Sequence, residues 1–335
     1  MKGVPVLSVD SLSVSFYTGN RPNNAVRDVS LRVYGGQTLC VVGESGCGKS
    51  VTAGAIMRLL PDLSRIERGS ITYHGPGGDV RIDRLERDGE AMRQLRGKDI
   101  AMIFQDPMTA LNPVYSVGYQ IAENLLTHER LTRSQAHERA VALLRSMDIP
   151  LPEQRAREYP HQFSGGMRQR AMIAMAMACN PRVLIADEPT TALDVTVQAQ
   201  IFELIERLKR ESGAGVMLIT HDMGVVTELA DDVAVMYMGS VVEEGPVDRV
   251  LGRPAHPYTR ALLKSIPVIG RGRAQRLEPI RGSTPDPHDR PPGCQFAPRC
   301  DYAAEACGRA MPDARDLPGG HRARCFRLEE VMGDG

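Results

Sequence analysis

The sequence lacks the features that would place the chain in a membrane or on a polyanion. No stretch comes near the ~20 apolar residues that a spanning helix needs. The first residues, from Met1 to Pro5, contain no apolar core of a secretory signal. The 41 basic and 41 acidic residues balance, so net charge gives no reason to expect binding to nucleic acid or acidic lipid. We therefore expect a cytosolic protein that meets any membrane through a partner.

A glycine-rich loop follows the apolar run at residues 39–42. It fits G-x-x-x-x-G-K-[ST] at every fixed position, in the strand, loop and helix context that this motif requires. Backbone amides of such a loop surround phosphate oxygens, Lys49 adds positive charge at the β- and γ-phosphates, and the Ser50 hydroxyl can ligate magnesium. We interpret Cys47 as a tolerated small residue rather than a reactive thiol. The predicted ATP-binding residues of the loop are Gly43, Glu44, Ser45, Gly46, Cys47, Gly48, Lys49, Ser50 and Val51.

Two carboxylates end the apolar run at residues 183–187. Asp187 is expected to hold magnesium, usually through water, and Glu188 to polarise the water that attacks ATP. In isolation, a buried strand followed by a polar turn is an equally good interpretation. The phosphate loop with Lys49 and Ser50 removes most of the weight from that alternative.

Two further polar residues follow strand-like runs. His221 comes after residues 216–220, at the strand end where open parallel sheets keep their ligand chemistry, and it is expected to contact the γ-phosphate and the attacking water. Gln105 follows residues 100–104 and would add a neutral ligand for magnesium or the water. The alternatives are a structural histidine and an ordinary loop glutamine.

Residues 163–170 read Phe-Ser-Gly-Gly-Met-Arg-Gln-Arg, a second glycine turn that opens a helix. Backbone N–H groups at a helix start form an anion site, so the chain offers two places for phosphate. These motifs, in this order, resemble the nucleotide-binding domain of ATP-binding cassette transporters over about residues 6–250. The resemblance implies that two such domains pair head to tail, with each ATP between the phosphate loop of one and the signature of the other.

The resemblance also assigns further residues. Gln105 matches the Q-loop and His221 the switch histidine, while residues 192–194 match the D-loop. Phe16 best matches the aromatic residue that stacks on adenine, with Tyr17 as the alternative and strand packing as the plain explanation for both. Met167 stands where many members carry glutamine, outside the Ser-Gly-Gly turn. Expected to face the partner's ATP are Ser164, Gly165, Gly166, Met167 and Gln169, and the D-loop contributes Asp194.

The expected fold is an α/β P-loop core, a mixed sheet flanked by helices. Residues 6–45 alternate as in an antiparallel β leaf, and residues 108–180 turn helical, as expected of an inserted helical subdomain. Thr132 with Gln135 resembles a capping box. The residues that then follow one helical face are Ala136, Ala140, Val141, Leu144 and Met147. We expect a nucleotide-binding domain at residues 1–251 and a small irregular domain at 252–335.

The last 84 residues differ in character, since they hold eleven of the 23 prolines and four of the seven cysteines. We expect little regular structure there beyond a short helix at 258–265. The stretch is mildly basic, but few aromatics interleave with its charges, so a solvated surface is favoured over nucleic-acid binding. The four clustered cysteines are Cys294, Cys300, Cys307 and Cys325.

Spacing alone leaves the role of these cysteines open between a metal or cluster, unligated thiols and a disulfide, although a cytosolic location disfavours the last. The paired C-x2-4-C spacing of zinc sites is missing, whereas iron–sulfur spacings are looser. Residues 256–263 and 293–300 resemble the C-terminal extension of oligopeptide, dipeptide and nickel permease ATPases. Several members of that group carry a four-iron four-sulfur (4Fe–4S) cluster on matching cysteines. The resemblance therefore favours this cluster over zinc.

The expected function is ATP binding and hydrolysis in an importer of di- or oligopeptides, on the cytoplasmic face of the inner membrane. The resemblance implies a second, similar ATPase in a heterodimer, two membrane-spanning permease subunits and an extracytoplasmic binding protein. Nickel, glutathione or another small solute is the alternative cargo. A soluble cassette ATPase of translation or DNA repair is more remote, because neither a second cassette nor a long coiled-coil insertion is visible. A regulatory subunit without hydrolysis is disfavoured, since Lys49, Glu188 and His221 are all present.

Overall fold

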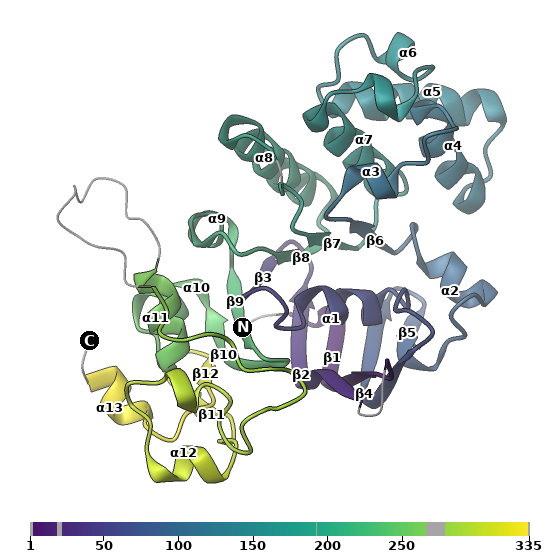
Figure 1. Ribbon diagram of the computed structural model, residues 1–335. Helices are drawn as coiled ribbons and strands as arrows, with labels where there is room; N and C mark the ends of the chain where they lie inside the picture. Colours follow the sequence, from purple (N-terminus) through teal and green to yellow (C-terminus); the bar gives the residue numbers. More distant parts are fainter. Residues whose placement is uncertain (1–2, 19–21, 192, 266–278, 334–335) are drawn as a thin grey trace. The chain divides into compact units, whose positions relative to one another are not determined.

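The computed structural model describes residues 3–18, 22–191, 193–265 and 279–333. They form two compact units. The first, here called the signature unit, comprises Met1–Leu7, Val33–Thr38 and Thr72–Ile219, and the second, the phosphate-loop unit, comprises Ser8–Arg32, Leu39–Ile71 and Thr220–Gly335. Figure 1 shows the elements of both along the chain.

The signature unit has a parallel sheet at its centre. Strand β7 (Val183–Asp187) lies between β6 (Ile100–Ile103) and β8 (Gly215–Ile219), with Ile100 opposite Val183 in the register. All five β7 residues are buried, as expected of a central strand covered on both faces. The sheet thus delivers the end of β7, with its acidic residues, to the same edge as the ends of its neighbours.

Helices fill the chain between β6 and β7. They are α3 (Pro107–Ala110), α4 (Val117–His128), α5 (Arg133–Ser146), α6 (Pro152–Arg155) and α7 (Gly165–Met177), and α4, α5 and α7 contact one another (Figure 1). The capping box that starts α5 is confirmed, because Thr132 and Gln135 bond each other's backbone N–H groups. The predicted apolar face is also confirmed, with Ala136, Ala140, Val141, Leu144 and Met147 all buried.

The other elements of the signature unit are shorter or follow β7. Helix α8 (Val195–Ser212) ends at Gly213, which adopts a left-handed conformation and closes the helix in the usual way. The remaining elements are β5 (Gly78–Arg81), the 3-10 turns at Ile82–Arg84 and Pro160–Gln162, and α2 (Glu90–Leu95).

The phosphate-loop unit holds most of the β leaf predicted for residues 6–45. Its strands are β1 (Pro5–Phe16), β2 (Asn23–Tyr34) and β4 (Ser64–Gly75), which lie in the order β2, β1, β4. Strand β3 (Thr38–Val42) pairs in parallel with β9 (Asp232–Tyr237) and leads through the phosphate loop into α1 (Lys49–Ile56). Helix α9 (Met223–Leu229) precedes β9, and β10 (Ser240–Pro246) pairs antiparallel with it.

The C-terminal residues contain more regular structure than expected. Helix α11 (Pro257–Lys264) confirms the short helix near residues 258–265. Beyond it, β12 (His321–Ala323) pairs with β10, and β11 (Arg315–Leu317) pairs with β12. The sequence failed to reveal these strands because three residues are too few for an alternating pattern. The remaining elements are α10 (Val247–Gly252), the 3-10 turn Ala297–Arg299, α12 (Glu305–Arg309) and α13 (Leu328–Gly333).

Among the described residues, none of the helices combines the length and the apolar character that crossing a bilayer would take.

Candidate functional site

At two positions of the phosphate loop, the backbone conformation is one that only glycine can adopt. Gly43 has φ 151° and Gly48 has φ 101°, both in the region that disfavours side chains. A Cβ at Gly43 would lie 2.1 Å from the Met236 carbonyl oxygen, and one at Gly48 would lie 2.6 Å from that of Ala25. The loop is therefore closely packed against β9 and β2, which fixes its path before any phosphate binds.

Lys49 is held against this loop. Its side chain is buried, and Nζ donates to the carbonyl oxygens of Gly43 at 2.7 Å and Glu44 at 3.2 Å. Ser50 is exposed in the first turn of α1, where its hydroxyl oxygen suits a hard cation such as magnesium. Burial raises the pKa of the Cys47 thiol, so the neutral form dominates, in keeping with an inert packing residue.

The side chain of Glu44 has a partner that the sequence did not reveal. Arg299 donates from Nη1 to Glu44 Oε2 at 2.7 Å and from Nη2 to Glu44 Oε1 at 3.0 Å. The hydroxyl oxygen of Tyr258 accepts the Glu44 backbone N–H at 2.9 Å. Glu44 was predicted to bind ATP, but its carboxylate and amide are both engaged within the protein. No sequence signal links residues this far apart.

Two aromatic residues were candidates for stacking on adenine. Tyr17 is exposed, with the Arg65 guanidinium 5.1 Å from its ring centroid, and its hydroxyl donates to Glu67 at 2.5 Å. Phe16 is half-buried at the end of β1. Only Tyr17 offers an exposed ring with a fixed orientation, although either assignment stays a prediction.

The end of β7 places the predicted acidic pair in the signature unit. Asp187 is buried, and Glu188 has a left-handed φ of 45°, which is costly for a residue with a side chain and typical of functional sites. Gln105 Nε2 donates to Glu188 Oε2 at 3.1 Å, and the Thr191 hydroxyl donates to the same oxygen at 3.1 Å. The structure thus brings Gln105 and Glu188 together and adds Thr191, which sequence reasoning missed because threonine in a turn gives no distinct signal.

His221 belongs to the other unit and is exposed two residues after β8. The next residue, Asp222, begins α9 and its carboxylate accepts the Gly224 N–H at 2.8 Å. This cap fixes the backbone that carries His221. Lys49, Ser50 and His221 therefore share the phosphate-loop unit, whereas Gln105, Asp187 and Glu188 share the signature unit.

The signature opens α7 as predicted for an anion-binding helix start. Ser164 caps this helix, with its hydroxyl accepting the Met167 N–H at 3.3 Å, and Ser164 and Gly165 are exposed. Gly166 and Met167 are half-exposed. Gln169, in contrast, is buried and its Nε2 lacks a hydrogen-bond partner, so its side chain does not lie at the surface.

The D-loop begins α8. Asp194 caps this helix through its carboxylate, which accepts the Val197 N–H at 3.0 Å. Ala192, also assigned to the D-loop, lies outside the described residues. Val195 beside the cap is 81% exposed, so this turn presents itself to solvent.

The four C-terminal cysteines are free thiols that share one neighbourhood. Burial raises the pKa of Cys300 to about 12, and the other three cysteines each add to the rise. Burial likewise raises the pKa of Cys325 to about 11. The Cys294 N–H donates to the Cys307 carbonyl at 2.8 Å, which ties two of the cysteine segments together.

Backbone amides point at the sulfur atoms of this group. The N–H of Ala304 lies 3.5 Å from Cys307 Sγ, and that of Arg327 lies 3.3 Å from Cys325 Sγ. Backbone hydrogen bonds from Phe296 and Tyr302 favour the thiolates of Cys294 and Cys300, against the larger effect of burial. Within the described ranges, however, no three Cys, His, Asp or Glu side chains are gathered closely enough to hold a metal ion.

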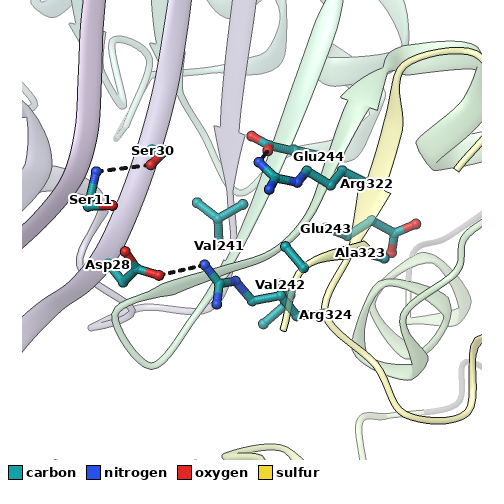
Figure 2. Close-up of a pocket in the computed structure, with 11 residues that line it drawn as sticks. Ser11, Asp28, Ser30, Val241, Val242, Glu243, Glu244, Arg322, Ala323 and Arg324 are labelled. Atoms are coloured by element: carbon teal, nitrogen blue, oxygen red, sulfur yellow. Dashed lines mark hydrogen bonds and ion pairs between the residues drawn. The ribbon is translucent and has the colours of Figure 1, made fainter. Parts of the chain in front are cut away.

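A small cavity of about 140 Å³ is lined by residues outside the phosphate loop. Figure 2 shows its lining side chains. Arg324 pairs with Asp28 at 2.8 Å, and Arg322 pairs with Glu244 at 3.6 Å. Glu243, which also lines the cavity, pairs with His321 outside it. The charged side chains of the lining are thus all engaged within the protein, and the cavity offers a ligand no unmatched group.

An exposed apolar surface surrounds α3 and the start of α4 in the signature unit. The rings of Tyr115 and Tyr119 stack with centroids 5.0 Å apart, and both are about half-exposed. Met108, in α3, is 56% exposed, and Val114, next to Tyr115 in the chain, is 69% exposed. We call these four residues the aromatic patch. Large apolar side chains gathered on a surface commonly mark a place for a partner.

Comparisons with known proteins agree with these features. A family model described as ABC transporter matches residues 26–191, and one described as the C-terminal region of oligopeptide/dipeptide transporters matches residues 242–307. The chain is 49% identical over 337 residues to a putative peptide import ATP-binding protein of Brucella abortus, covering 99% of both. It is 48% identical to the dipeptide transport ATP-binding protein DppD of Bacillus subtilis, covering 97% of this chain and 95% of that protein.

A solved structure extends the comparison to the fold. The dimeric structure of an ATP-binding cassette in a post-hydrolysis state, bound to ADP and Pi, matches with a TM-score of 0.63 at 26% identity. The match covers 72% of this chain and 98% of that one, and it confirms the predicted P-loop α/β fold. With a phosphate loop, an acidic strand end, a signature helix and relatives alike over nearly their whole length, the chain belongs to the ATPases of the ATP-binding cassette transporter family.

Proposed function

We propose that this ATPase powers the import of di- or oligopeptides. The observation that carries the proposal is the likeness over nearly the full chain to proteins named for peptide import and dipeptide transport. The match of residues 242–307 to the oligopeptide/dipeptide transporter C-terminal region supports it independently of the ATP site. We divide the chain at residues 251 and 252 into a nucleotide-binding domain and this extension.

In the proposed reaction, Glu188 is the general base that draws a proton from the attacking water. Its strained backbone and its hydrogen bonds from Gln105 and Thr191 support a carboxylate held in one orientation. Lys49 neutralises charge on the phosphates, and His221 orients the water and γ-phosphate. Ser50, Asp187 and Gln105 would hold magnesium through oxygen atoms, which this ion prefers, and the bound ion would neutralise developing negative charge on the phosphates.

We further propose that two ATPase subunits close around ATP, with the signature of one capping nucleotide held by the other. The exposed Ser164 and Gly165 at the start of α7 support this, because their backbone can meet a phosphate from outside the chain. A heterodimer with a second ATPase of similar sequence is the favoured pairing.

The permease partners are proposed to dock on the aromatic patch. It follows Gln105, the residue that contacts Glu188, along the chain of the signature unit. A movement of the aromatic patch caused by the permease would shift Gln105 and, through its hydrogen bond, the Glu188 carboxylate. Two permease subunits and an extracytoplasmic binding protein complete the assembly, and the ATPase lies on the cytoplasmic face of the membrane.

The four cysteines are proposed to hold a 4Fe–4S cluster. Four thiols in one neighbourhood, with backbone amides directed at their sulfur atoms, are a suitable donor set, since such hydrogen bonds tune iron–sulfur clusters. The cysteines lack the paired C-x2-4-C spacing of zinc sites, which favours a cluster over zinc. Ligation would require the loss of the thiol protons, because the pKa of a cysteine thiol ordinarily lies above neutrality and burial raises that of Cys300 and Cys325 further.

Uptake measurements test the proposed cargo. A strain lacking the gene should lose uptake of labelled di- and tripeptides, and the wild-type gene but not a Glu188→Gln variant should restore it. Labelled nickel and labelled glutathione serve as parallel substrates. Peptide uptake that persists at its wild-type rate in the deletion strain, with loss of either other solute, would overturn the peptide assignment while leaving the ATPase intact.

A further inference from the structure

The C-terminal segment, residues 252–335, contacts the phosphate loop through side chains. Arg299 lies in a 3-10 turn of that segment, and its guanidinium makes a two-pronged contact with the Glu44 carboxylate, at 2.7 and 3.0 Å. Bidentate pairs of this kind fix the planes of both groups relative to each other. Both residues belong to the phosphate-loop unit.

The guanidinium has little freedom. The Arg299 side chain is 4% exposed, whereas that of Glu44 is 26% exposed. Arg299 Nε donates to the Arg281 carbonyl oxygen at 2.9 Å, and Arg299 Nη1 also donates to the Tyr237 hydroxyl at 3.2 Å. Hydrogen bonding to Glu44 raises the pKa of Arg299, so the cation is favoured at every working pH. The partners of the guanidinium hold it in place, so it constrains the position of the Glu44 carboxylate.

A second contact from the same segment holds the backbone of Glu44. The Tyr258 hydroxyl accepts the Glu44 N–H at 2.9 Å, and its ring packs against Tyr237 and Phe296 with centroid separations of 4.6 and 5.4 Å. The loop is thus tied at one residue through both side chain and main chain, to α11 and to the turn that carries Arg299.

Glu44 in turn touches the lysine that the reaction needs. Its carbonyl oxygen accepts from Lys49 Nζ at 3.2 Å, beside the contact from Gly43 at 2.7 Å. A continuous line of contacts therefore runs from Arg299 through Glu44 to Lys49. A shift of Glu44 would move both a carbonyl partner of Lys49 and the start of the loop whose amides surround phosphate.

We propose that Arg299 is a positioning residue for the phosphate loop, so that the C-terminal segment sets the affinity of the chain for ATP. When a loop is held in its ligand-binding conformation before the ligand arrives, binding does not have to offset the free energy of ordering the loop. The segment thereby serves the ATP site directly, whichever solute the transporter carries and whatever the cysteines hold.

The test is a double-mutant cycle on the full-length chain, with MgATP as the ligand. Arg299→Met should raise the Kd for MgATP about tenfold or more, because Glu44 loses its buried partner. Glu44→Gln should produce a similar rise in Kd. The Kd of the double variant should be no higher than that of the single variant with the higher Kd. In steady-state hydrolysis, KM should rise by the same factor while kcat at saturating ATP changes less. Arg299→Lys, which keeps the charge but loses the fork, should fall between Met and wild type.

Arg253→Met is the matched control, because Arg253 is an exposed arginine of the same segment that follows α10 and lies outside the contacts of Arg299 and Glu44 described above. It should leave Kd and KM unchanged. If Arg299→Met fails to fold, Glu44→Gln and Arg299→Lys carry the test by themselves. A Kd within about twofold of wild type in folded Arg299 and Glu44 variants, even with a lowered melting temperature, would overturn the proposal. So would single effects that multiply in the double variant, since the two residues would then act separately.

Discussion

Gln105 Nε2 donates a hydrogen bond to Glu188 Oε2 across 3.1 Å, and the Thr191 hydroxyl shares the same oxygen. One carboxylate oxygen of Glu188 is thus held by two neutral donors. Neutral donors can orient a carboxylate without the large charge stabilisation that a cation would bring. The carboxylate is therefore held in one direction, as the role of accepting a proton from water requires.

We expect Glu188→Gln to bind ATP as wild type does but to lose turnover by at least about a hundredfold, because an amide cannot accept the proton. Binding of MgATP and release of phosphate would be measured on the same preparation. Glu203→Gln, an exposed change on α8, is the control for a lost carboxylate. Hydrolysis at the wild-type rate in Glu188→Gln would remove this residue from the role of base.

Lys49→Ala should act on ATP binding itself. The ammonium that supplies positive charge at the phosphates is lost, together with its hydrogen bonds to Gly43 and Glu44. We expect the Kd for MgATP to rise about a hundredfold, as measured by equilibrium dialysis. Lys98→Ala, at an exposed lysine, should leave the Kd unchanged. Equal affinities of the Lys49 variant and the wild type would show that this loop is not the ATP site.

Ser164→Arg should impair an ATP site that lies outside its own chain. The bulky cation replaces the cap of α7, where a phosphate from the partner is proposed to approach. In a pair formed with an intact second ATPase, hydrolysis at the partner's phosphate loop should fall at least about tenfold, while the variant still binds ATP at its own loop. Full activity at the partner's site would contradict the two-chain arrangement.

The proposed cluster at the four cysteines predicts a visible absorbance spectrum for the purified protein. Protein purified without oxygen should contain about four iron and four labile sulfide per chain and absorb in the visible charge-transfer region. Replacement of Cys300 by serine should remove that absorbance, whereas Cys179→Ser, at a half-buried cysteine of the signature unit, should retain it. Protein free of iron and sulfide, with no visible absorbance, would exclude the cluster.

Stability should depend on acid through His256. Burial lowers its pKa from 6.5 to about 4, although Glu243 nearby opposes this, and its Nδ1 accepts the Tyr258 N–H at 3.0 Å. Between pH 6.5 and pH 4 the unfolded chain binds a proton that the folded chain refuses, so the free energy of unfolding falls as pH falls. The loss approaches about 3 kcal/mol at pH 4 and is absent above pH 7.

His256→Asn keeps a helix cap but removes this titration, so chemical denaturation from pH 7 to pH 4 should give a shallower loss of stability than in wild type. His288→Asn, at an exposed loop histidine, should retain the wild-type slope. Identical slopes for wild type and His256→Asn would show that His256 is not the group responsible.

The local chemistry of this protein could be predicted from its residues alone. The phosphate loop, the two carboxylates after β7 and the capped start of α7 are encoded by residues that are neighbours in the chain, where spacing and residue type decide the conformation. The face of α5 and its capping box followed from the helical period for the same reason.

The contacts between distant residues depend on the folded arrangement of the chain. Contacts of Arg299 with Glu44 and of Gln105 with Glu188 join positions far apart in the chain, and no local pattern records such pairs. The β11–β12 hairpin forms because β10 offers it an edge for strand pairing. Its own strands are too short to be predicted from the sequence. Neighbouring residues choose a conformation by steric and hydrogen-bonding preferences along the backbone, whereas distant ones meet only where the packed core brings their elements together.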